Sequence, residues 1–499
     1  MDQNNKKADI IFGYWNVRAN GQVSRLLLEY TGQTNYTNKL YTEQNYQQWF
    51  EQDKIKLIKE FPNLPFLIQG DFQLTESQAI DFYIMGQSEL KEQLLGKDLL
   101  EQGLIKKLFY IGKQLQSKLF TICDSPQYEE MKEKRQEEIK SDLLKFAQYK
   151  GNRSFLLGEK VTYPDFLLYE IIYLFKAAYG NEALEKQNEF LSLVNLCFNF
   201  EKIPQIKEYL NSERVIKRQY LPYKKQKEGE NQNENENDQK LVQQKVPCEQ
   251  NGFALPQKLS QNDEKIELAY WDGIRARGQS SYYLLAYSGL NYNIKKYTMQ
   301  QYQEWVEKDK VEMLKKTPFA NLPYVKDGEL IITETPAVQE YIALRSGKKE
   351  LLGVNFEEKV KIQQQYGIAN DIFFKLYEVI FDKENCLKKM EEGYYKQNLE
   401  AKTNQLLEKI GKNGSQFLNG KLPSLPDFVF AECCKVFLEA FYDELHDNST
   451  FEKIKQYVER FENIPEIQEF IKNSKDYVDR PYYTKFLAGW SSGIRSKNK

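Results

Sequence analysis

The sequence predicts a duplicated chain in which each copy is an α/β domain followed by an all-helical domain. Residues 61–68 have the length and apolar character of a buried strand, and residues 70–84 pass through a turn into helical spacing. This order of strand, hairpin and helix returns from residue 319 onward, with Pro323 lying 258 positions after Pro65. The helix start that follows repeats at the same offset, so the chain is a tandem repeat.

The first copy contains the element order β-α-β-α-β-β-α. A strand is predicted at residues 10–15, a helix at 21–30, an extended segment at 36–46, a helix at 49–58, and then the hairpin and helix described above. This order is that of a thioredoxin-like unit, here without a Cys-x-x-Cys motif. Ligands of open α/β sheets bind beyond the carboxyl ends of the strands, so Tyr14 at the end of the first strand marks an expected site.

Helical patterning follows each α/β unit, at residues 94–221 and 357–471. Thr162 with Asp165 predicts a capping box at the start of a buried helix, and Ser424 with Asp427 repeats it. The predicted domains are thioredoxin-like at 9–91, helical at 92–222, a disordered linker at 223–264, thioredoxin-like at 265–347 and helical at 348–490. The linker is rich in Glu, Asn and Gln, and as a flexible chain it would span roughly 35 Å.

Composition excludes several classes of function. A net charge of −2, from 70 basic and 72 acidic residues, provides no global field for nucleic acid or an anionic membrane. The six cysteines follow no metal-ligand spacing, and His446 is the only histidine, which excludes a multi-histidine metal site. No signal peptide and no apolar run of about 18 residues is found, so we expect a cytoplasmic protein without a metal.

Pro65 opens a buried strand directly after Asn63 and Leu64. Only X-Pro bonds adopt the cis form at low cost, so we predict cis bonds before Pro65 and Pro323. A cis bond would turn the backbone of Leu64 outward, beside the helix start at residues 76–77. Such an edge is a receptacle for a peptide-like ligand with an anionic end. The alternative is an ordinary hairpin packed on a helix.

Four separated motifs resemble those of one enzyme family. They are residues 13–18, 25–31, 61–65 and 161–166. Together they are similar to the cytosolic glutathione transferases of the mu class, with the sigma and alpha classes close by. The resemblance covers nearly all of residues 9–222 and, more weakly, 265–490. It implies a thioredoxin-like domain followed by an all-helical domain, a two-fold dimer, and glutathione as co-substrate.

The resemblance also implies roles for individual residues of the first module. Tyr14 matches the catalytic tyrosine, whose hydroxyl stabilises the glutathione thiolate. The expected glutathione contacts are Trp15 beside it, Trp49 and Lys54 at the glycyl carboxylate, Asn63, Leu64 and Pro65 at the cysteinyl main chain, and Glu76 and Ser77 at the γ-glutamyl end. Lys54 matches only after allowing one extra residue in its loop, and mu members usually have Gln in place of Glu76.

The second module departs from this pattern. The matching positions are Tyr270, Trp305, Lys310, Asn321, Leu322, Pro323, Glu334 and Thr335. One extra residue follows Tyr270, so we expect that tyrosine to be misplaced. Tyr282 stands in place of Arg25, and Pro336 removes a backbone N–H from the anion-binding end of a helix. These changes predict a degenerate second site that is weakened or inactive.

The dimers of the family suggest that the two modules pair within one chain as a pseudo-dimer. Phe61 and Phe319 occupy the position of the family's interface residue. An aspartate from one subunit of mu-like dimers reaches the γ-glutamyl amine in the other. The matching position is Asp371 in module 2 and the uncharged Gln114 in module 1, so Asp371 is expected to complete the site of module 1. The alternative is a solvent-facing Asp371.

The leading hypothesis is a detoxification enzyme that conjugates glutathione to a hydrophobic electrophile, mainly in module 1. Asp124 falls where mu members place an acceptor-site tyrosine, so the acceptor chemistry can differ. A glutathione-dependent isomerase is a second enzymatic hypothesis. A scaffold that uses the fold to bind a protein assembly partner is the hypothesis from another class, because fold does not fix function.

Overall fold

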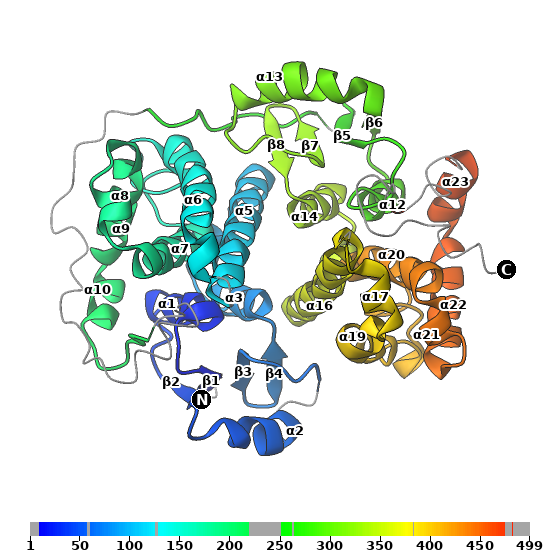
Figure 1. Cartoon of the computed structure of the whole chain (residues 1–499), viewed down its shortest axis with the longest axis horizontal. Coiled ribbons are helices and arrows are strands. Elements are labelled where there is room, and N and C mark those ends of the chain that lie inside the picture. The colour runs from blue at the N-terminus through cyan, green and yellow to red at the C-terminus, as the bar shows by residue number, and fades with distance from the viewer. Residues whose placement is uncertain are drawn as a thin grey trace, which may run out of the picture. The chain divides into compact units, whose positions relative to one another are not determined.

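The fold consists of two modules with the same order of elements. The computed structural model describes residues 9–56, 60–124, 128–218, 251–261, 264–382 and 384–474, together with Tyr482. Within them, each module has one four-stranded mixed sheet followed by helices (Figure 1). The predicted duplication and the β-α-β-α-β-β-α order are therefore confirmed.

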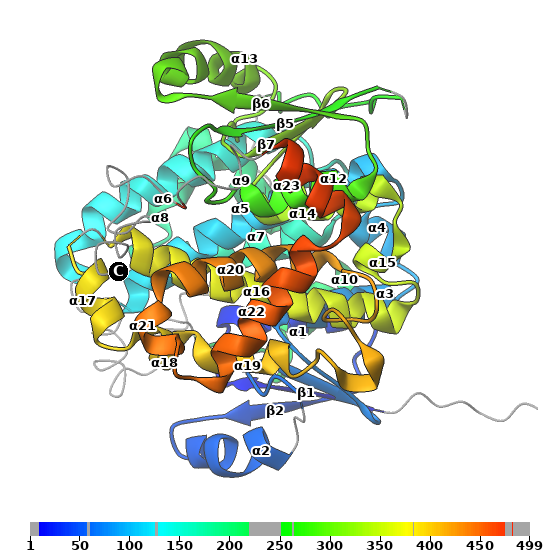
Figure 2. The ribbon, with the colours of Figure 1, turned by 90° about the vertical axis from the view of Figure 1, so that its right-hand side faces the viewer.

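The sheet of module 1 has its first strand in the interior. Its elements are β1 (Ile10–Trp15), α1 (Gln22–Tyr30), β2 (Tyr36–Tyr41), the π-helix η2 (Gln48–Asp53), α2 (Lys54–Lys56), β3 (Phe66–Gln69), β4 (Phe72–Thr75) and α3 (Ser77–Gly86). The strand order is β2-β1-β3-β4, with β1 parallel to β2 and antiparallel to β3. Helices α1 and α3 cover one face of the sheet and α2 lies on the other (Figures 1 and 2).

The helical domain of module 1 packs on α1. It contains α4 (Lys91–Leu95), α5 (Leu99–Asp124), α6 (Tyr128–Lys150), α7 (Tyr163–Tyr179), α8 (Glu182–Glu185), α9 (Leu191–Glu201) and α10 (Pro204–Leu210). Helices α7 and α10 both contact α1. The helical pattern predicted to residue 221 thus ends at Leu210 within the described part of the chain, and residues 219–222 lie outside it.

Module 2 repeats this arrangement. Its α/β elements are β5 (Ile266–Trp271), α12 (Gln279–Ser288), β6 (Tyr292–Tyr297), the π-helix η7 (Glu304–Asp309), α13 (Lys310–Leu314), β7 (Tyr324–Asp327), β8 (Leu330–Thr333) and α14 (Thr335–Ser346). The strand order β6-β5-β7-β8 matches that of module 1. The helices that follow are α15 (Lys349–Leu352), α16 (Phe356–Phe381), α17 (Cys386–Glu391), α18 (Tyr394–Asn398), α19 (Glu400–Leu407), α20 (Leu425–Ala440), α21 (Tyr442–Leu445), α22 (Ser449–Glu462) and α23 (Pro465–Asn473).

Capping boxes start the central helix of each helical domain. The backbone N–H and the hydroxyl of Thr162 both donate to the Asp165 carboxylate at 2.8 Å. In module 2 the same groups of Ser424 donate to Asp427 at 2.8 and 2.7 Å. Both predicted boxes are confirmed, and each satisfies a polar helix end that is buried.

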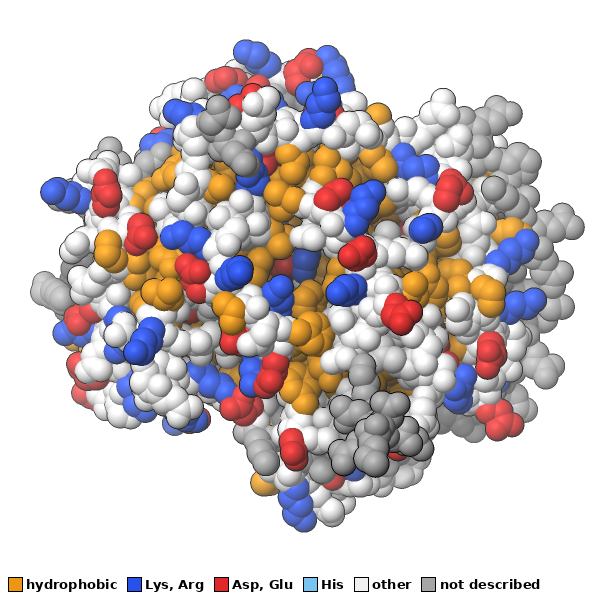
Figure 3. Space-filling view, turned by 180° about the vertical axis from the view of Figure 1, so that it is seen from behind, with side chains coloured by type: hydrophobic (Ala, Val, Ile, Leu, Met, Phe, Trp, Pro, Cys, Tyr) orange, Lys and Arg blue, Asp and Glu red, His pale blue; other side chains and the backbone are white. Residues whose placement is uncertain are grey.

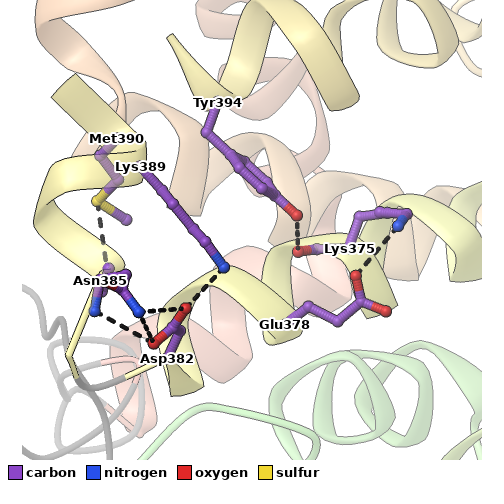
Figure 4. Close-up of polar contacts among 8 residues, drawn as sticks. Lys375, Glu378, Asp382, Asn385, Lys389, Met390 and Tyr394 are labelled. Carbon is purple, nitrogen blue, oxygen red and sulfur yellow. Dashed lines mark hydrogen bonds and ion pairs between the residues drawn. The ribbon is translucent and has the colours of Figure 1, made fainter. Parts of the chain in front are cut away.

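The end of the long helix α16 is held by side chains from the elements that follow it (Figure 4). Lys389 donates to the carboxylate of Asp382 at 2.6 Å, and the backbone N–H of Asn385 donates to the same group at 3.1 Å. The hydroxyl of Tyr394 donates to the carbonyl of Lys375 at 3.0 Å. These contacts fix α17 and α18 against α16.

The described part of the predicted linker is extended chain held by hydrogen bonds. The N–H of Phe253 donates to the carbonyl of Tyr149 at 3.1 Å. Farther along, the N–H of Ser260 donates to Asp327 at 2.8 Å. For residues 251–261 this differs from the expected disorder, because these backbone groups find partners that composition does not reveal. The rest of the linker that precedes them, from residue 223 to 250, lies outside the described residues.

A buried lysine lies in the first of the chain's two compact units, which contains residues 309–320 in addition to module 1. Lys107 on α5 is 2% exposed. Its ammonium donates to the hydroxyl of Thr317 at 3.0 Å and lies 5.9 Å from the ring centres of Tyr149 and Phe319. Burial lowers the pKa of Lys107 to about 7.

This lysine predicts a distinctive pH dependence of stability. Between pH 7 and the ordinary lysine pKa near 10.5, the unfolded chain binds more protons than the folded one, so stability rises with pH. Below pH 7 the full cost of the buried charge remains. We expect Lys107→Met to raise the free energy of unfolding near pH 7 by roughly 3 kcal/mol and to flatten the rise toward pH 10.

Thermal and urea unfolding at several pH values measure this effect. Lys118→Met on the same helix is the control, since Lys118 is half exposed and pairs with Asp142. Identical pH profiles for the wild-type chain and Lys107→Met would show that Lys107 is not held in its neutral form.

Candidate functional site

Tyr14 lies at the carboxyl end of the interior strand β1, where it pairs with Leu40 of β2. Its ring is buried against the loop that leads into α1. A Cβ added at Gly21 would lie 2.5 Å from the ring carbon Cδ1, so only glycine leaves room for the tyrosine there. Tyr14 therefore lies where the sequence predicted it, and its ring is held between strand β1 and the loop that leads into α1.

Burial has the largest effect on the hydroxyl of Tyr14, whose pKa is raised, and polar groups around it offset part of that effect. Burial raises the pKa of Tyr14, while the backbone N–H and the side chain of Asn20 and the Arg25 guanidinium lower it. Ala19, with a φ of 34°, forms the turn that presents Asn20. Asn20 donates to the tyrosine oxygen, so the one hydrogen bond that the Tyr14 O–H can itself donate is not used by Asn20.

Asn20 and Gly21 were missed in the sequence. A signal was present, because Ala-x-Gly recurs at residues 19–21 and 276–278. Arg25 was noticed as part of a motif and as the position that Tyr282 takes in module 2. The structure shows that it fixes the loop, donating to the carbonyl of Val17 at 2.9 Å and of Trp15 at 3.3 Å.

The predicted γ-glutamyl end and the predicted cysteinyl edge meet in module 1. The bond before Pro65 is cis, as predicted. The side-chain amide of exposed Asn63 donates to Glu76 at 3.4 Å, across the gap between β3 and α3. Glu76 has a φ of 67° and precedes α3, whose N-terminal N–H groups start at Ser77. Leu64 is half-buried.

The structure does not bring the residues expected at the glycyl carboxylate together on an open surface. Trp49 is only 3% exposed and stacks on Phe66 with ring centres 5.9 Å apart, so it is a core residue. Trp15 packs edge-on against Tyr41. Lys54 is half-buried, at the end of the π-helix η2, which absorbs the extra residue noticed in this loop.

Module 2 places Tyr270 as module 1 places Tyr14, which corrects the expected misplacement. The extra residue forms a turn at Gly273, with a φ of 79°, and leaves the following loop unchanged. A Cβ at Gly278 would lie 2.4 Å from the Tyr270 ring. The N–H of Arg277 donates to the Tyr270 hydroxyl at 3.3 Å. Burial raises the pKa of Tyr270 to about 12.

The anion-binding end of module 2 differs from that of module 1. Asn321 still donates to Glu334 at 3.4 Å, and the bond before Pro323 is cis, as predicted. The hydroxyl of Thr335 is buried and has no hydrogen-bond partner among the described residues. Pro336 stands in the first turn of α14, which therefore lacks one N–H donor.

The remaining residues of the second site repeat those of the first. Trp305 is 4% exposed and stacks on Tyr324, as Trp49 does on Phe66. Lys310 is half-buried at the start of α13, directly after the second π-helix. Leu322 is 8% exposed.

Comparison with known proteins identifies the family. The description "Glutathione S-transferase, N-terminal domain" matches residues 11–86 and 266–344, and "Glutathione S-transferase, C-terminal domain" matches residues 91–213 and 370–474. The chain is 37% identical over 210 residues to the class-mu 26 kDa glutathione S-transferase isozyme of Schistosoma mansoni, covering 41% of this chain and 90% of that protein. The chain belongs to the glutathione S-transferase family. It is also 32% identical over 218 residues to glutathione S-transferase Mu 1 of Homo sapiens, covering 42% of this chain and 94% of that protein.

Each domain type of the transferase is matched twice, so the tandem duplication of a mu-like glutathione S-transferase is confirmed. In the part of the chain that the structure describes, no helix is both long and apolar enough to span a membrane. Nor do the described side chains contain a cluster of potential metal ligands. On the face drawn in Figure 3, basic and acidic side chains are interspersed, in keeping with the small net charge.

Asp371 of this transferase has a partner in its own module. It lies on α16, and its carboxylate accepts a hydrogen bond from Lys402 of α19. Its side chain remains 47% exposed. The predicted contact with the γ-glutamyl amine in module 1 stays a prediction, and it would require Asp371 to share its charge with Lys402 or exchange this partner.

The close approach of Gly21 to Tyr14 predicts the effect of adding one methyl group. Gly21→Ala places a Cβ inside the tyrosine ring's space, so the ring must shift and its hydroxyl leaves Asn20. We expect roughly tenfold slower glutathione conjugation without loss of the fold. Gly278→Ala introduces the same clash against Tyr270 and serves as the matched control. Unchanged turnover in Gly21→Ala would show that the ring position is not critical.

Proposed function

We propose that this protein conjugates the thiolate of glutathione to electrophilic small molecules, with the active site in module 1. The observation that carries the proposal is the hydroxyl of Tyr14, held by N–H donors of Asn20 at the end of β1. The Tyr14 hydroxyl can also donate one hydrogen bond, which a thiolate would accept. Cytoplasmic location and a hydrophobic acceptor remain predictions that accompany this proposal.

A hydrogen bond from the Tyr14 hydroxyl can supply the free energy needed to lower the pKa of the glutathione thiol. Lowering a thiol pKa by one unit needs about 1.4 kcal/mol of preferential thiolate stabilisation. A hydrogen bond to a charged group contributes about 1.5 to 3 kcal/mol. One O–H donor from Tyr14 can therefore shift the glutathione thiol from about 8.5 to near neutral.

The rest of glutathione would lie along the edge between β3 and α3. The backbone of Leu64, whose N–H donates to the Asn63 side-chain oxygen at 2.9 Å without ligand, pairs with the cysteinyl main chain. The N-terminus of α3 at Ser77 holds the γ-glutamyl carboxylate. Glu76 accepts the γ-glutamyl amine, with Asn63 steadying its carboxylate. Lys54 provides the cation for the glycyl carboxylate.

Module 2 is proposed to bind glutathione weakly. Tyr270 is in place, so the argument for degeneracy now rests on α14, where Pro336 removes an N–H donor. Tyr282 also stands in place of Arg25, and the cation near Tyr270 is instead Arg277. A scaffold would have no use for the Tyr14 and Asn20 arrangement, which favours an enzyme. The isomerase hypothesis uses the same thiolate, and product analysis distinguishes it from conjugation.

The two modules are further proposed to act as an intrachain pseudo-dimer. Residues 309–320 belong to the first compact unit, and there the ring of Phe319 packs 5.0 Å from Phe146 and 5.5 Å from Tyr149. This contact supports Phe319 as an interface residue. A tethered partner also has an effective concentration of about millimolar, which favours pairing within the chain.

Replacing the tyrosine hydroxyl tests the proposed chemistry. We expect Tyr14→Phe to lower kcat for conjugation roughly 100-fold while glutathione affinity changes little, because the hydroxyl acts on the thiolate. Steady-state kinetics with 1-chloro-2,4-dinitrobenzene and calorimetric titration of glutathione measure the two effects. Tyr270→Phe is the matched control and should leave turnover nearly unchanged. The reverse result would place the active site in module 2.

A second substitution tests the composite site. If Asp371 completes the site of module 1, Asp371→Asn should weaken glutathione binding several-fold, because the bound amine loses a counter-ion. Asp382→Asn is a matched control, since Asp382 also pairs with a lysine at the end of α16. Equal glutathione affinity in the two variants and the wild-type chain would contradict the role of Asp371.

A further inference from the structure

The turn that holds Tyr14 in place starts at Arg18 and is closed by a backbone hydrogen bond. The N–H of Gly21 donates to the carbonyl of Arg18 at 3.1 Å. Gly21 lies against the Tyr14 ring, and the backbone N–H and the side chain of Asn20 contact the Tyr14 oxygen. Both residues that hold the tyrosine therefore depend on where Arg18 lies, and a small displacement of Arg18 changes the geometry at the hydroxyl.

A segment from the other end of module 1 holds Arg18. It consists of residues 212–218, which follow α10, and we call it the brace. The carbonyl of Arg218 accepts a hydrogen bond from the backbone N–H of Arg18 at 3.0 Å. The carbonyl of Ile216, 198 positions from Arg18 in sequence, accepts one from the guanidinium at 3.3 Å. The brace therefore fixes both the main chain and the side chain of Arg18.

The brace is itself bound to α1 and α10. Arg214 forms an ion pair with buried Glu29 of α1 at 3.0 Å. The N–H of Ile216 donates to the hydroxyl of Tyr209 on α10, which also accepts a hydrogen bond from Gln22 of α1 at 3.2 Å. Ile216 is 6% exposed, so its side chain is packed as well. Arg214 and Ile216 are therefore two residues that keep the brace in place.

We propose that the brace is a positioning element of the glutathione site in module 1. Arg214 and Ile216 keep the brace against Arg18, and Arg18 keeps the turn at residues 19–21 against Tyr14. The inference rests on the proposed transferase function and adds positioning residues to that site. These residues act through Arg18 and not on glutathione itself.

Module 2 makes the same kind of contact with different residues. The carbonyl of Tyr482, which lies beyond α23, accepts a hydrogen bond from the N–H of Ala276 at 3.1 Å. Tyr482 is fully buried, and its ring centre lies 6.0 Å from the guanidinium carbon of Arg275. The next N–H along the turn, that of Arg277, donates to the Tyr270 hydroxyl at 3.3 Å. Support of the tyrosine's turn by a segment beyond the last helix is thus kept in both modules.

A displaced turn has a distinct effect on the pH dependence of the reaction. If Tyr14 is poorly oriented, its hydrogen bond to the thiolate weakens and the pKa of the bound glutathione thiol rises. The thiolate fraction then falls below that pKa and is unchanged well above it. A brace variant therefore loses activity at low pH and regains it at high pH. Partial unfolding would instead lower the rate by a similar factor across this range.

Two variants of the full chain give the result. Arg214→Met leaves the buried carboxylate of Glu29 without its counter-ion, and Ile216→Ala removes a packed side chain. At saturating glutathione, with 1-chloro-2,4-dinitrobenzene, we expect each to lower kcat about fivefold near pH 6 and less than about twofold near pH 9. Arg214→Lys keeps the counter-ion and should restore most of the lost rate. Arg135→Met, which breaks an arginine ion pair with Glu138 on α6, is the control and should change neither rate.

Amide hydrogen exchange provides a readout that is independent of activity. Because the Arg18 N–H is bonded to the brace, the peptide that covers residues 15–22 should exchange faster in both variants than in the wild-type chain. Matched thermal midpoints verify that the variants are folded. If Ile216→Ala does not fold, Arg214→Met decides alone, since the Arg214 side chain is 43% exposed.

The outcomes separate the inference from the function on which it rests. A rate loss of equal size at all pH values, or full activity with unchanged exchange in folded variants, would overturn the role of the brace while leaving the transferase intact. Absence of conjugation in the wild-type chain would overturn the proposed function and the inference with it. Loss confined to low pH and rescued by Arg214→Lys supports both.

Discussion

A buried arginine ties the loop after the first strand to the helical domain, and the geometry of the site depends on it. In module 1, Arg18 is 3% exposed and donates to both carboxylate oxygens of Glu170 on α7, at 3.1 and 2.5 Å. Leaving either charge unpaired in the interior would cost several kcal/mol, so the pair holds its position firmly. Residues 19–21 follow Arg18 directly in the chain. The ion pair of Arg18 therefore also fixes the turn that places Asn20 against Tyr14.

In the second module, the matching arginine, Arg275, has fewer of its hydrogen-bond donors paired. Arg275 donates to both oxygens of Glu439 at 2.8 and 2.7 Å, while the nearest oxygen of buried Glu432 is 3.6 Å from its Nε. Burial raises the pKa of Glu432 to about 7, and its oxygens have no hydrogen-bond partner in the described parts of the chain. Ser281 is also buried without such a partner among the described residues. Each unmade bond costs about 1 to 3 kcal/mol, so the residues around Tyr270 are held less firmly than those around Tyr14.

Local patterns carried much of the prediction. The repeat, the order of elements and both capping boxes depend on residues close in sequence, and each was found as expected. The cis bond at Pro65 belongs to the same class, because its chemistry lies within one dipeptide. Tyr14 was identified as the candidate catalytic residue through motifs and its place at a strand end. Its environment was not foreseen, since Lys113 approaches Asn20 from a helix 93 positions away.

The sequence by itself determined the fold of each of the two modules and which residue types stand at each position of that fold. Only the tertiary structure decided how the exceptions are accommodated. The extra residue after Tyr270 was expected to displace it, but a left-handed turn at Gly273 takes up the insertion. Nothing in the sequence indicates a partner for Asp371, yet Lys402 from another helix donates a hydrogen bond to its carboxylate. The physical reason is range: propensity, caps and turns act over a few residues, whereas ion pairs and close packing join residues that only the fold brings together.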